Sequence, residues 1–139
     1  MLHGIFPALL TPFSADGCTI ELEKIQPLCD ALLADGVDGF FVCGTTGEAP
    51  YLTADEKIAV LTEAVRAVNG RGKILAQVGC GDWPSTLKVV RAVRQIGVDA
   101  VSLLQPWFFR YDDEAQYQYI ARVAEALDGQ GQTRVVGMI

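Results

Sequence analysis

Short apolar runs alternate with longer stretches of helical periodicity along the whole chain. A strand buried on both faces reads as a brief apolar run, whereas apolar residues at every third or fourth position mark one face of a helix. The segments that predict strands are 5–10, 39–43, 74–78, 100–104 and 134–139. One helical pattern lies in each interval between them. The chain therefore predicts a regular succession of β and α elements.

Residues with turn and capping preferences mark the ends of these elements. Gly36 stands where the first helix should stop, and Pro27 predicts an irregular first turn or a start near 24–26. Thr53, followed three residues later by Glu56, predicts a capping box for the second helix. The third helix should begin near Pro84, and Asp112 or Asp113 should cap the fourth. The apolar faces are expected at Ile25, Leu28, Cys29, Leu32 and Leu33, at Ile58, Leu61, Val65 and Val68, at Val89, Val90, Val93 and Ile96, and at Tyr117, Ile120, Val123, Ala124 and Leu127.

A five-residue pattern recurs two βα units apart. The segment 36–40 reads Gly-Val-Asp-Gly-Phe and the segment 97–101 reads Gly-Val-Asp-Ala-Val, each at a helix-to-strand junction. Such a β/α succession requires right-handed crossovers and parallel strands. Two architectures satisfy it: part of a barrel, or an open doubly wound sheet. At 139 residues we expect a single domain, 1–139.

Composition and charge exclude several classes of partner. The net charge is −6, with an isoelectric point near 4.6, so nucleic acid and anionic membranes are not expected to bind. The N-terminus lacks the pattern of a signal peptide, which predicts a cytoplasmic protein. The single histidine is His3, and the four cysteines show no Cys-x-x-Cys spacing, so we expect free thiols, no metal site and no cofactor.

The loops that follow the strands should carry the chemistry, because the carboxyl ends of parallel strands form the open face of β/α folds. The segment 44–48 reads Gly-Thr-Thr-Gly-Glu. Its glycines let the backbone approach a ligand closely, and its hydroxyls and amides could hold a small carboxylate or phosphate. A plain tight turn with threonines bound to local backbone would leave the same residues.

Several motifs together resemble one family of enzymes. They are the segment 4–13 with Ala8 and Thr11-Pro12, the run 44–48, Thr53 with Glu56, the turn 79–81, and the segment from Gly97-Val98-Asp99 to Pro106. In this order and spacing they resemble the dihydrodipicolinate synthase and N-acetylneuraminate lyase family over the whole chain. The resemblance implies an α/β fold that is the N-terminal half of a (β/α)₈ TIM barrel, with about four and a half βα units and parallel strands.

The resemblance also implies a chemistry. Members are Schiff-base aldolases, in which a lysine amine condenses with pyruvate or a related 2-oxo acid to give an electron sink. It implies that the Thr45 hydroxyl relays a proton and that Thr45, Thr46 and Gly47 hold the substrate carboxylate. Glu48 is implied to be mainly a structural partner of nearby backbone.

The sequence departs from the family pattern in two respects. Phe108 stands where the family places a relay tyrosine, and a phenyl ring cannot relay a proton; Tyr111 is three residues away. The family's second tyrosine and its Schiff-base lysine would follow Ile139. The four lysines of the chain are expected to be solvated surface charges, with Lys24, Lys57 and Lys88 on helices and Lys73 at the opposite end of its strand.

Three functions remain open at this point. The first is the N-terminal portion of a lyase that lacks the Schiff-base lysine, binding a small 2-oxo acid and forming a homo-oligomer or pairing with a chain that completes the barrel. The second is a non-catalytic remnant or interaction module that keeps the carboxylate site and needs such a partner. A nucleotide-binding domain fits less well, because no Gly-x-Gly-x-x-Gly follows the first strand. The aromatic run 107–109 suits a subunit contact or a ligand.

Overall fold

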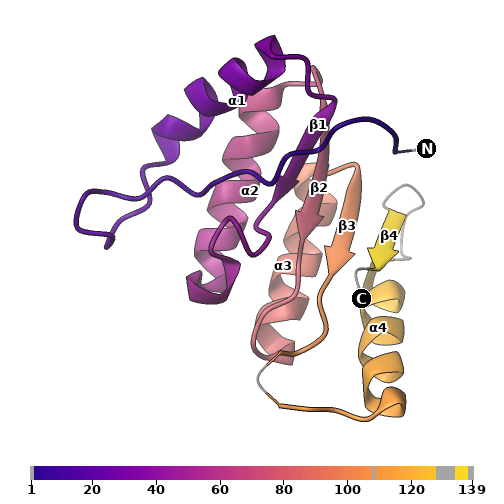
Figure 1. Ribbon diagram of the computed structural model, residues 1–139. Coiled ribbons are helices and arrows are strands. Elements are labelled where there is room, and N and C mark those ends of the chain that lie inside the picture. The colour runs from indigo at the N-terminus through magenta and orange to yellow at the C-terminus, as the bar shows by residue number, and fades with distance from the viewer. Residues whose placement is uncertain (1, 108, 128–133, 138–139) are drawn as a thin grey trace.

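A parallel sheet forms the centre of the molecule. The computed structural model describes residues 2–107, 109–127 and 134–137. The four strands are β1 (Gly39–Val42), β2 (Lys73–Gln77), β3 (Ala100–Leu103) and β4 (Arg134–Gly137), and every neighbouring pair is parallel. They lie side by side in the order β1-β2-β3-β4 (Figure 1). This sequential order is the one expected for part of a barrel and differs from that of a flavodoxin-like sheet.

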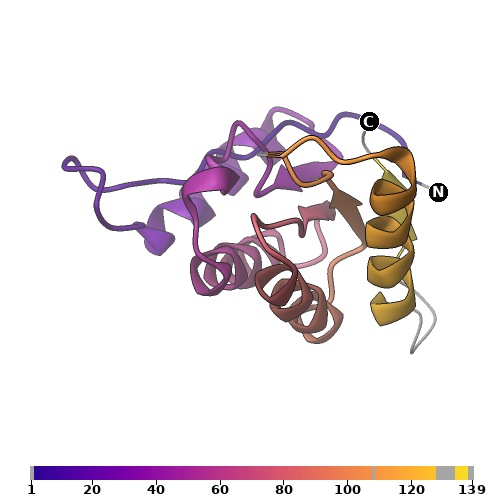
Figure 2. The same cartoon turned by 90° about the horizontal axis from the view of Figure 1, so that it is seen from below.

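The helices alternate with the strands. They are α1 (Ile25–Ala34), α2 (Ala54–Val68), α3 (Trp83–Ile96) and α4 (Asp113–Leu127), with short 3₁₀ turns η1 (Leu22–Lys24) and η2 (Ala49–Tyr51). Each helix packs beside the next, and α2 and α3 lie together along one face of the sheet (Figure 2). The loops that follow the strands therefore gather at one end of the molecule.

The predicted first strand, 5–10, is not a regular strand. Only Ala8 forms a parallel bridge, to Phe41, through the Leu9 amide and the Pro7 carbonyl. The next bridge would need the residue at position 7 to donate its N–H to β1, and proline has none. The segment nevertheless lies next to β1, where the sequence placed it, and extends the sheet order by one position.

Local sequence signals fix the helix ends. The η1 turn precedes α1, which begins at Ile25, so the irregular start near Pro27 is confirmed. The capping box is present: the Glu56 amide donates to Thr53 Oγ1 and the Thr53 amide donates to Glu56 Oε2. Asp112 rather than Asp113 caps α4, because the Ala115 amide donates to Asp112 Oδ1 at 2.8 Å.

The repeated pentapeptide performs the same task at both of its positions. Gly36 and Gly97 end their helices with φ of +90° and +88°. The Asp38 amide donates to the Ile5 carbonyl while an Asp38 carboxylate oxygen accepts from the Ile5 amide at 2.8 Å. Asp99 makes the same pair of bonds with Ile74, at 3.0 and 2.9 Å. Each aspartate thus fixes the incoming strand against its predecessor in the sheet.

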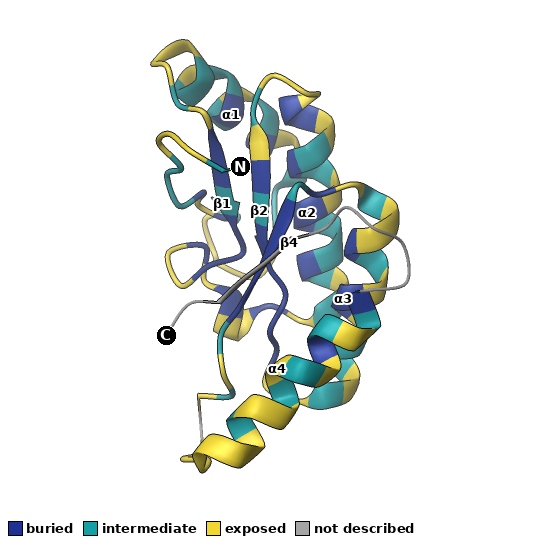
Figure 3. Cartoon of the chain, turned by 90° about the vertical axis from the view of Figure 1, so that its right-hand side faces the viewer, coloured by how far each residue is buried: buried dark blue, intermediate teal, exposed yellow. Residues whose placement is uncertain are grey.

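The hydrophobic core lies between the sheet and the helices, where the strands in Figure 3 are mostly dark blue. Val89, Val90 and Val93 of α3 are buried as predicted. The expected apolar face of α4 is only partly correct. Val123 and Leu127 are buried, but Tyr117 and Ile120 are 65% and 45% exposed, and α4 is largely yellow in Figure 3. No described part of the chain covers that side of the helix.

Candidate functional site

The loop after β1 is held in an uncommon backbone conformation. Cys43 and Glu48 flank it, and both have φ of +58°, in the left-handed region that side chains other than glycine seldom occupy. The Glu48 amide donates to the Thr45 carbonyl and the Ala49 amide to the Gly44 carbonyl, at 3.0 and 3.3 Å. The segment 44–47 is therefore a compact turn whose two ends are fixed by the chain itself.

Close packing explains both glycines of the loop. A Cβ on Gly44 would lie 2.5 Å from the Phe41 ring, and one on Gly47 would lie 2.9 Å from the Leu9 carbonyl oxygen. The Gly47 carbonyl also accepts a hydrogen bond from the buried hydroxyl of Thr11, at 2.7 Å. The Thr-Pro segment that follows the first predicted strand therefore supports the loop directly, which gives a structural reason for both motifs.

The backbone amides of the loop are available as hydrogen-bond donors. Among the residues that the structure describes, none accepts a hydrogen bond from the four amides of residues 44–47. The side chains of Thr45 and Thr46 are exposed, whereas Gly47 is buried. Thr45 lines a cavity, but Thr46 and Gly47 do not. The three site residues predicted from the sequence thus share one loop, and only Thr45 borders the cavity.

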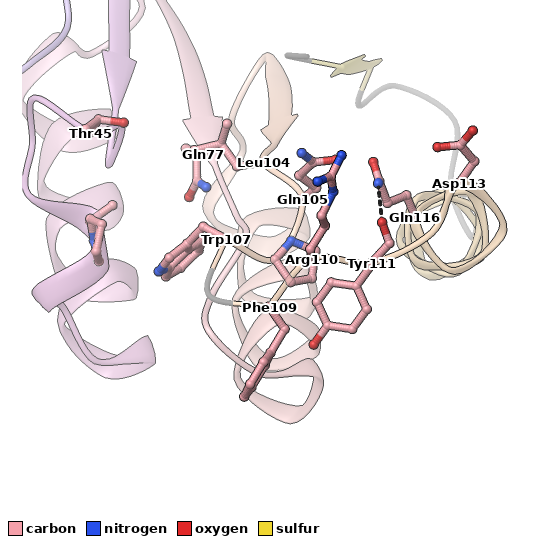
Figure 4. A pocket seen from close by; sticks show the side chains of 13 residues that line it. Thr45, Gln77, Leu104, Gln105, Trp107, Phe109, Arg110, Tyr111, Asp113 and Gln116 are labelled. Carbon is pink, nitrogen blue, oxygen red and sulfur yellow. Dashed lines mark hydrogen bonds between the residues drawn. The ribbon is translucent and has the colours of Figure 1, made fainter.

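The cavity has a volume of about 800 Å³ and lies between this loop and the loop after β3 (Figure 4). Its wall combines Thr45 and the end of β2 with an aromatic and polar segment that leads into α4. The lining residues include Gln77, Gln105, Trp107, Arg110, Tyr111 and Gln116. Arg110 brings a positive charge to a site where a carboxylate is expected.

Sequence reasoning missed Gln77 and Arg110. Gln77 is the last residue of β2 and has no exposed surface. Its position at a strand end was the available signal, since functional side chains gather there in β/α folds. Arg110 follows the aromatic run by one residue, where only loop geometry can direct its side chain toward the cavity.

The expectation for Lys57 was wrong. Its side chain is 1% exposed rather than solvated, and its Nζ donates to the Gly79 carbonyl at 2.5 Å and to Gln77 Oε1 at 3.4 Å. Lys57 lies at the N-terminus of α2, so its long side chain reaches over the end of β2. The other three lysines do lie at the surface, in ion pairs: Lys24 with Glu21, Lys73 with Asp99, and Lys88 with Asp55.

Burial sets the chemistry of the cysteines. It raises the pKa of the Cys29 thiol to about 11 and that of the Cys43 thiol to about 12, because burial disfavours the thiolate. Burial also raises the pKa of Cys80. All four cysteines are free thiols, and Cys18 is exposed. Within the described residues, no group of histidine, cysteine and acidic side chains could hold a metal ion.

The aromatic and polar segment of the cavity wall leads into α4, and α4 packs against α3. Tyr119 packs edge-on against Trp83 with ring centroids 6.1 Å apart, and its hydroxyl lies 3.1 Å from that of Thr86. Burial raises the pKa of Tyr119. The Arg122 guanidinium, also on α4, stacks over the Trp83 ring, 4.2 Å from its centroid. These contacts hold the middle of α4 close to the start of α3.

Two further sequence predictions concern tyrosine chemistry. Phe108, which stands in place of the relay tyrosine, lies outside the described residues. Tyr111 lines the cavity and is 41% exposed; its carbonyl accepts a hydrogen bond from Gln116 Nε2 at 2.9 Å (Figure 4).

In the described part of the chain no helix is long and apolar enough to cross a membrane.

Comparison with known proteins gives consistent results. The model of the dihydrodipicolinate synthetase family matches residues 1–131. The chain is 37% identical over 121 residues to 4-hydroxy-tetrahydrodipicolinate synthase of Bacillus subtilis, covering 87% of the chain and 41% of that enzyme. A DapA-like lyase of Pyrobaculum islandicum, described as uncharacterized, is 32% identical over 127 residues, which are 91% of the chain and 42% of that protein.

Solved structures match the fold closely. N-acetylneuraminate lyase of Mycoplasma synoviae superposes with a TM-score of 0.89 at 25% identity, covering 96% of this chain and 45% of that one. The N-acetylneuraminate lyase of Aliivibrio salmonicida gives a TM-score of 0.88 at 29% identity, covering 98% and 45%. The chain spans less than half the length of the relatives that it matches. Its fold is the N-terminal portion of a TIM barrel, and by sequence and structure together the chain belongs to the dihydrodipicolinate synthetase family.

Proposed function

We propose that this chain is the N-terminal, carboxylate-binding portion of a Schiff-base lyase that acts on pyruvate or a related 2-oxo acid. The observation that carries the proposal is the loop 44–47, with its unoccupied amides, beside a cavity that Thr45 lines. Amides that point together from a tight turn bind small anions. The names of the relatives, synthases and lyases alike, support the class of reaction.

The proposal gives each loop residue a role. The carboxylate accepts hydrogen bonds from the amides of 44–47 and from the Thr46 hydroxyl, while the Thr45 hydroxyl, on the cavity wall, relays a proton. Gly47 serves by its backbone, since the Thr11 hydroxyl already holds its carbonyl. Arg110 adds electrostatic attraction for the anion.

None of the four lysines in the chain is proposed to form the Schiff base. Condensation needs an unprotonated amine that faces the substrate carbonyl. Lys57 is sealed from the cavity and donates to Gly79 and Gln77, and the remaining three are exposed and ion-paired. Borohydride reduction with pyruvate, followed by intact-protein mass, is expected to give no adduct with this chain. A stoichiometric adduct on any of the four lysines would overturn this assignment.

A titration tests the carboxylate site. Pyruvate is added to the ¹⁵N-labelled chain, and we expect the amides of 44–47 to shift first, with weak affinity because part of the cavity wall is open to solvent. Thr46→Val should weaken binding several-fold by removing one hydroxyl donor. Thr62→Val is the matched control, because the Thr62 hydroxyl is bound to the Ile58 carbonyl on α2. Shifts spread evenly over the surface would refute the proposal.

A second candidate function is a non-catalytic module that binds a carboxylate and pairs with another chain. The exposure of Tyr117 and Ile120 on α4 favours it, because apolar side chains of this size are commonly covered by a partner. The enzyme would be favoured by a longer reading frame with a tyrosine after β4, which is the fifth strand when 5–10 is counted as the first, and a lysine at the end of the next strand. The absence of such a frame would favour the module.

A further inference from the structure

Two buried polar groups, one at the end of β2 and one in the neighbouring strand β3, have no hydrogen-bond partner among the described residues. They are Gln77 Nε2 and Ser102 Oγ. Gln77 and Ser102 are register partners in neighbouring parallel strands, so their side chains leave the sheet on the same face. Both residues are fully buried. A buried donor left unpaired destabilises a protein by roughly 1–3 kcal/mol, so such a group calls for a physical explanation.

Lys57 determines which way the Gln77 amide faces. Its Nζ lies 3.4 Å from Gln77 Oε1 and 2.5 Å from the Gly79 carbonyl. A lysine ammonium carries donors and no acceptor, so it requires the oxygen of the carboxamide on its side. The nitrogen of Gln77 is therefore turned away from Lys57. The orientation follows from the chemistry of the lysine.

Gly79 provides the room for this arrangement. A Cβ at that position would lie 3.1 Å from Gln77 Nε2 and 3.0 Å from the Leu104 carbonyl oxygen, tighter than ordinary contact. Gln77 borders the same cavity as Thr45, and Figure 4 shows its side chain extending from the end of β2 toward Trp107. A donor with a fixed orientation thus lies at the cavity wall near the carboxylate loop.

We propose that Gln77, oriented by Lys57, is a specificity-determining residue that donates a hydrogen bond from Nε2 to a second oxygen of the ligand, adjacent to its carboxylate. The site then prefers 2-oxo or 2-hydroxy acids over plain carboxylic acids of the same size. Lys57 acts as a positioning residue and does not contact the ligand. The inference rests on the proposed carboxylate role of 44–47 and extends it.

Two ligands distinguish the proposed carboxylate role of 44–47 from the proposed role of Gln77. Pyruvate and propionate both carry a carboxylate, and only pyruvate has an oxygen at the second carbon. In NMR titrations of the chain, both acids should shift the amides of 44–47, and pyruvate should bind about fivefold more tightly, as expected for one neutral hydrogen bond. If neither acid shifts these amides, the proposed function fails and this inference with it. If both bind with equal affinity, only the role of Gln77 is refuted.

Variants test whether Gln77 causes the preference for pyruvate over propionate. Gln77→Met keeps the side-chain volume and removes both donors, so it should abolish the preference for pyruvate and leave propionate binding unchanged. Gln77→Glu is the second variant, because a carboxylate keeps Lys57 paired and the shape intact while it removes the donors. Gln105→Met changes an exposed glutamine on the same cavity and should retain the preference. A preference that survives in both Gln77 variants overturns the proposal.

Lys57→Met tests the positioning role. With no donor beside Oε1, the carboxamide can turn over, and the preference for pyruvate should fall at least twofold while propionate binds as before. A merely structural role for Lys57 would weaken both acids equally. That outcome, in a variant whose amide spectrum remains dispersed, would remove Lys57 from the proposal.

Discussion

Burial, more than any neighbouring charge, controls thiol reactivity in this chain. Cys43 and Cys29 have thiol pKa values of about 12 and about 11, and Cys80 is also raised, so few of these thiols are ionised near neutral pH. We expect iodoacetamide at about pH 8 to alkylate the exposed Cys18 rapidly and the other three only after unfolding. Peptide mass spectrometry, with a sample in denaturant as control, measures this. Modification of Cys43 at the rate of Cys18 would contradict it.

The same thiols predict a loss of stability in alkali. The folded pKa of Cys29 lies above the ordinary value of 9.0, so the folded state holds its proton more tightly than the unfolded state. This contribution is fully present below pH 9 and is lost as the pH rises toward 11. The urea midpoint should therefore fall between pH 8 and about pH 10.5, and by less in Cys29→Ala. Equal falls in the two proteins would show that other groups are responsible.

At the scale of elements, the repeated aspartate is expected to stabilise strand pairing. Asp99 accepts a hydrogen bond from the partly buried Ile74 amide and pairs with Lys73 at 2.7 Å. Asp99→Ala leaves that amide without its partner and should lower the free energy of unfolding by about 1–3 kcal/mol. Asp35→Ala, at an exposed position after α1, should change it by less than about 0.5 kcal/mol. Chemical denaturation compares the two variants, and equal effects would refute the role.

Element order and type could be predicted from the sequence because they depend on local signals. The capping box at Thr53, the stop at Gly36 and the apolar runs of β1 to β3 act over a few residues, and the structure has them where expected. The burial of Lys57 could not be predicted in this way. Helical periodicity gives the direction of a side chain, but its partner Gly79 is 22 residues away and depends on how α2 meets β2.

The same distinction between local signals and contacts of distant residues applies to the candidate site. Thr45, Thr46 and Gly47 could be predicted as site residues because they form one contiguous motif, and that prediction stays open. Gln77 and Arg110 join the cavity only through the parallel register of the strands and the path of the loop after β3. Such long-range placement leaves no periodic trace in the sequence. The expectation of a regular strand at 5–10 was wrong for a local reason that the sequence contains: Pro7 has no N–H to donate to the neighbouring strand.

At the scale of the molecule, the uncovered apolar surface predicts association. Tyr117, Ile120 and Trp107 are between 45% and 65% exposed, and β4 pairs with β3 alone among the described strands. An open strand edge beside apolar side chains favours contact with another chain. We expect sedimentation at micromolar concentration to show dimers or larger species.

A matched pair of variants tests where the contact lies. Ile120→Asp places a charge on the exposed apolar side of α4 and should shift the distribution toward monomer. Gln118→Asp adds the same charge to the same helix at an exposed polar position and should not. A wild-type chain that sediments as a stable monomer at these concentrations would contradict the prediction.

The left-handed residues at both ends of the 44–47 loop also bear on the entropy of binding. Cys43 and Glu48 hold uncommon backbone angles, and the Thr11 hydroxyl fixes the Gly47 carbonyl before any ligand arrives. The loss of conformational freedom that a loose loop would undergo on binding has thus already occurred during folding. In the proposed role of the loop, a carboxylate meets amides already in place, so that even a weak ligand keeps most of the hydrogen-bond energy that it gains.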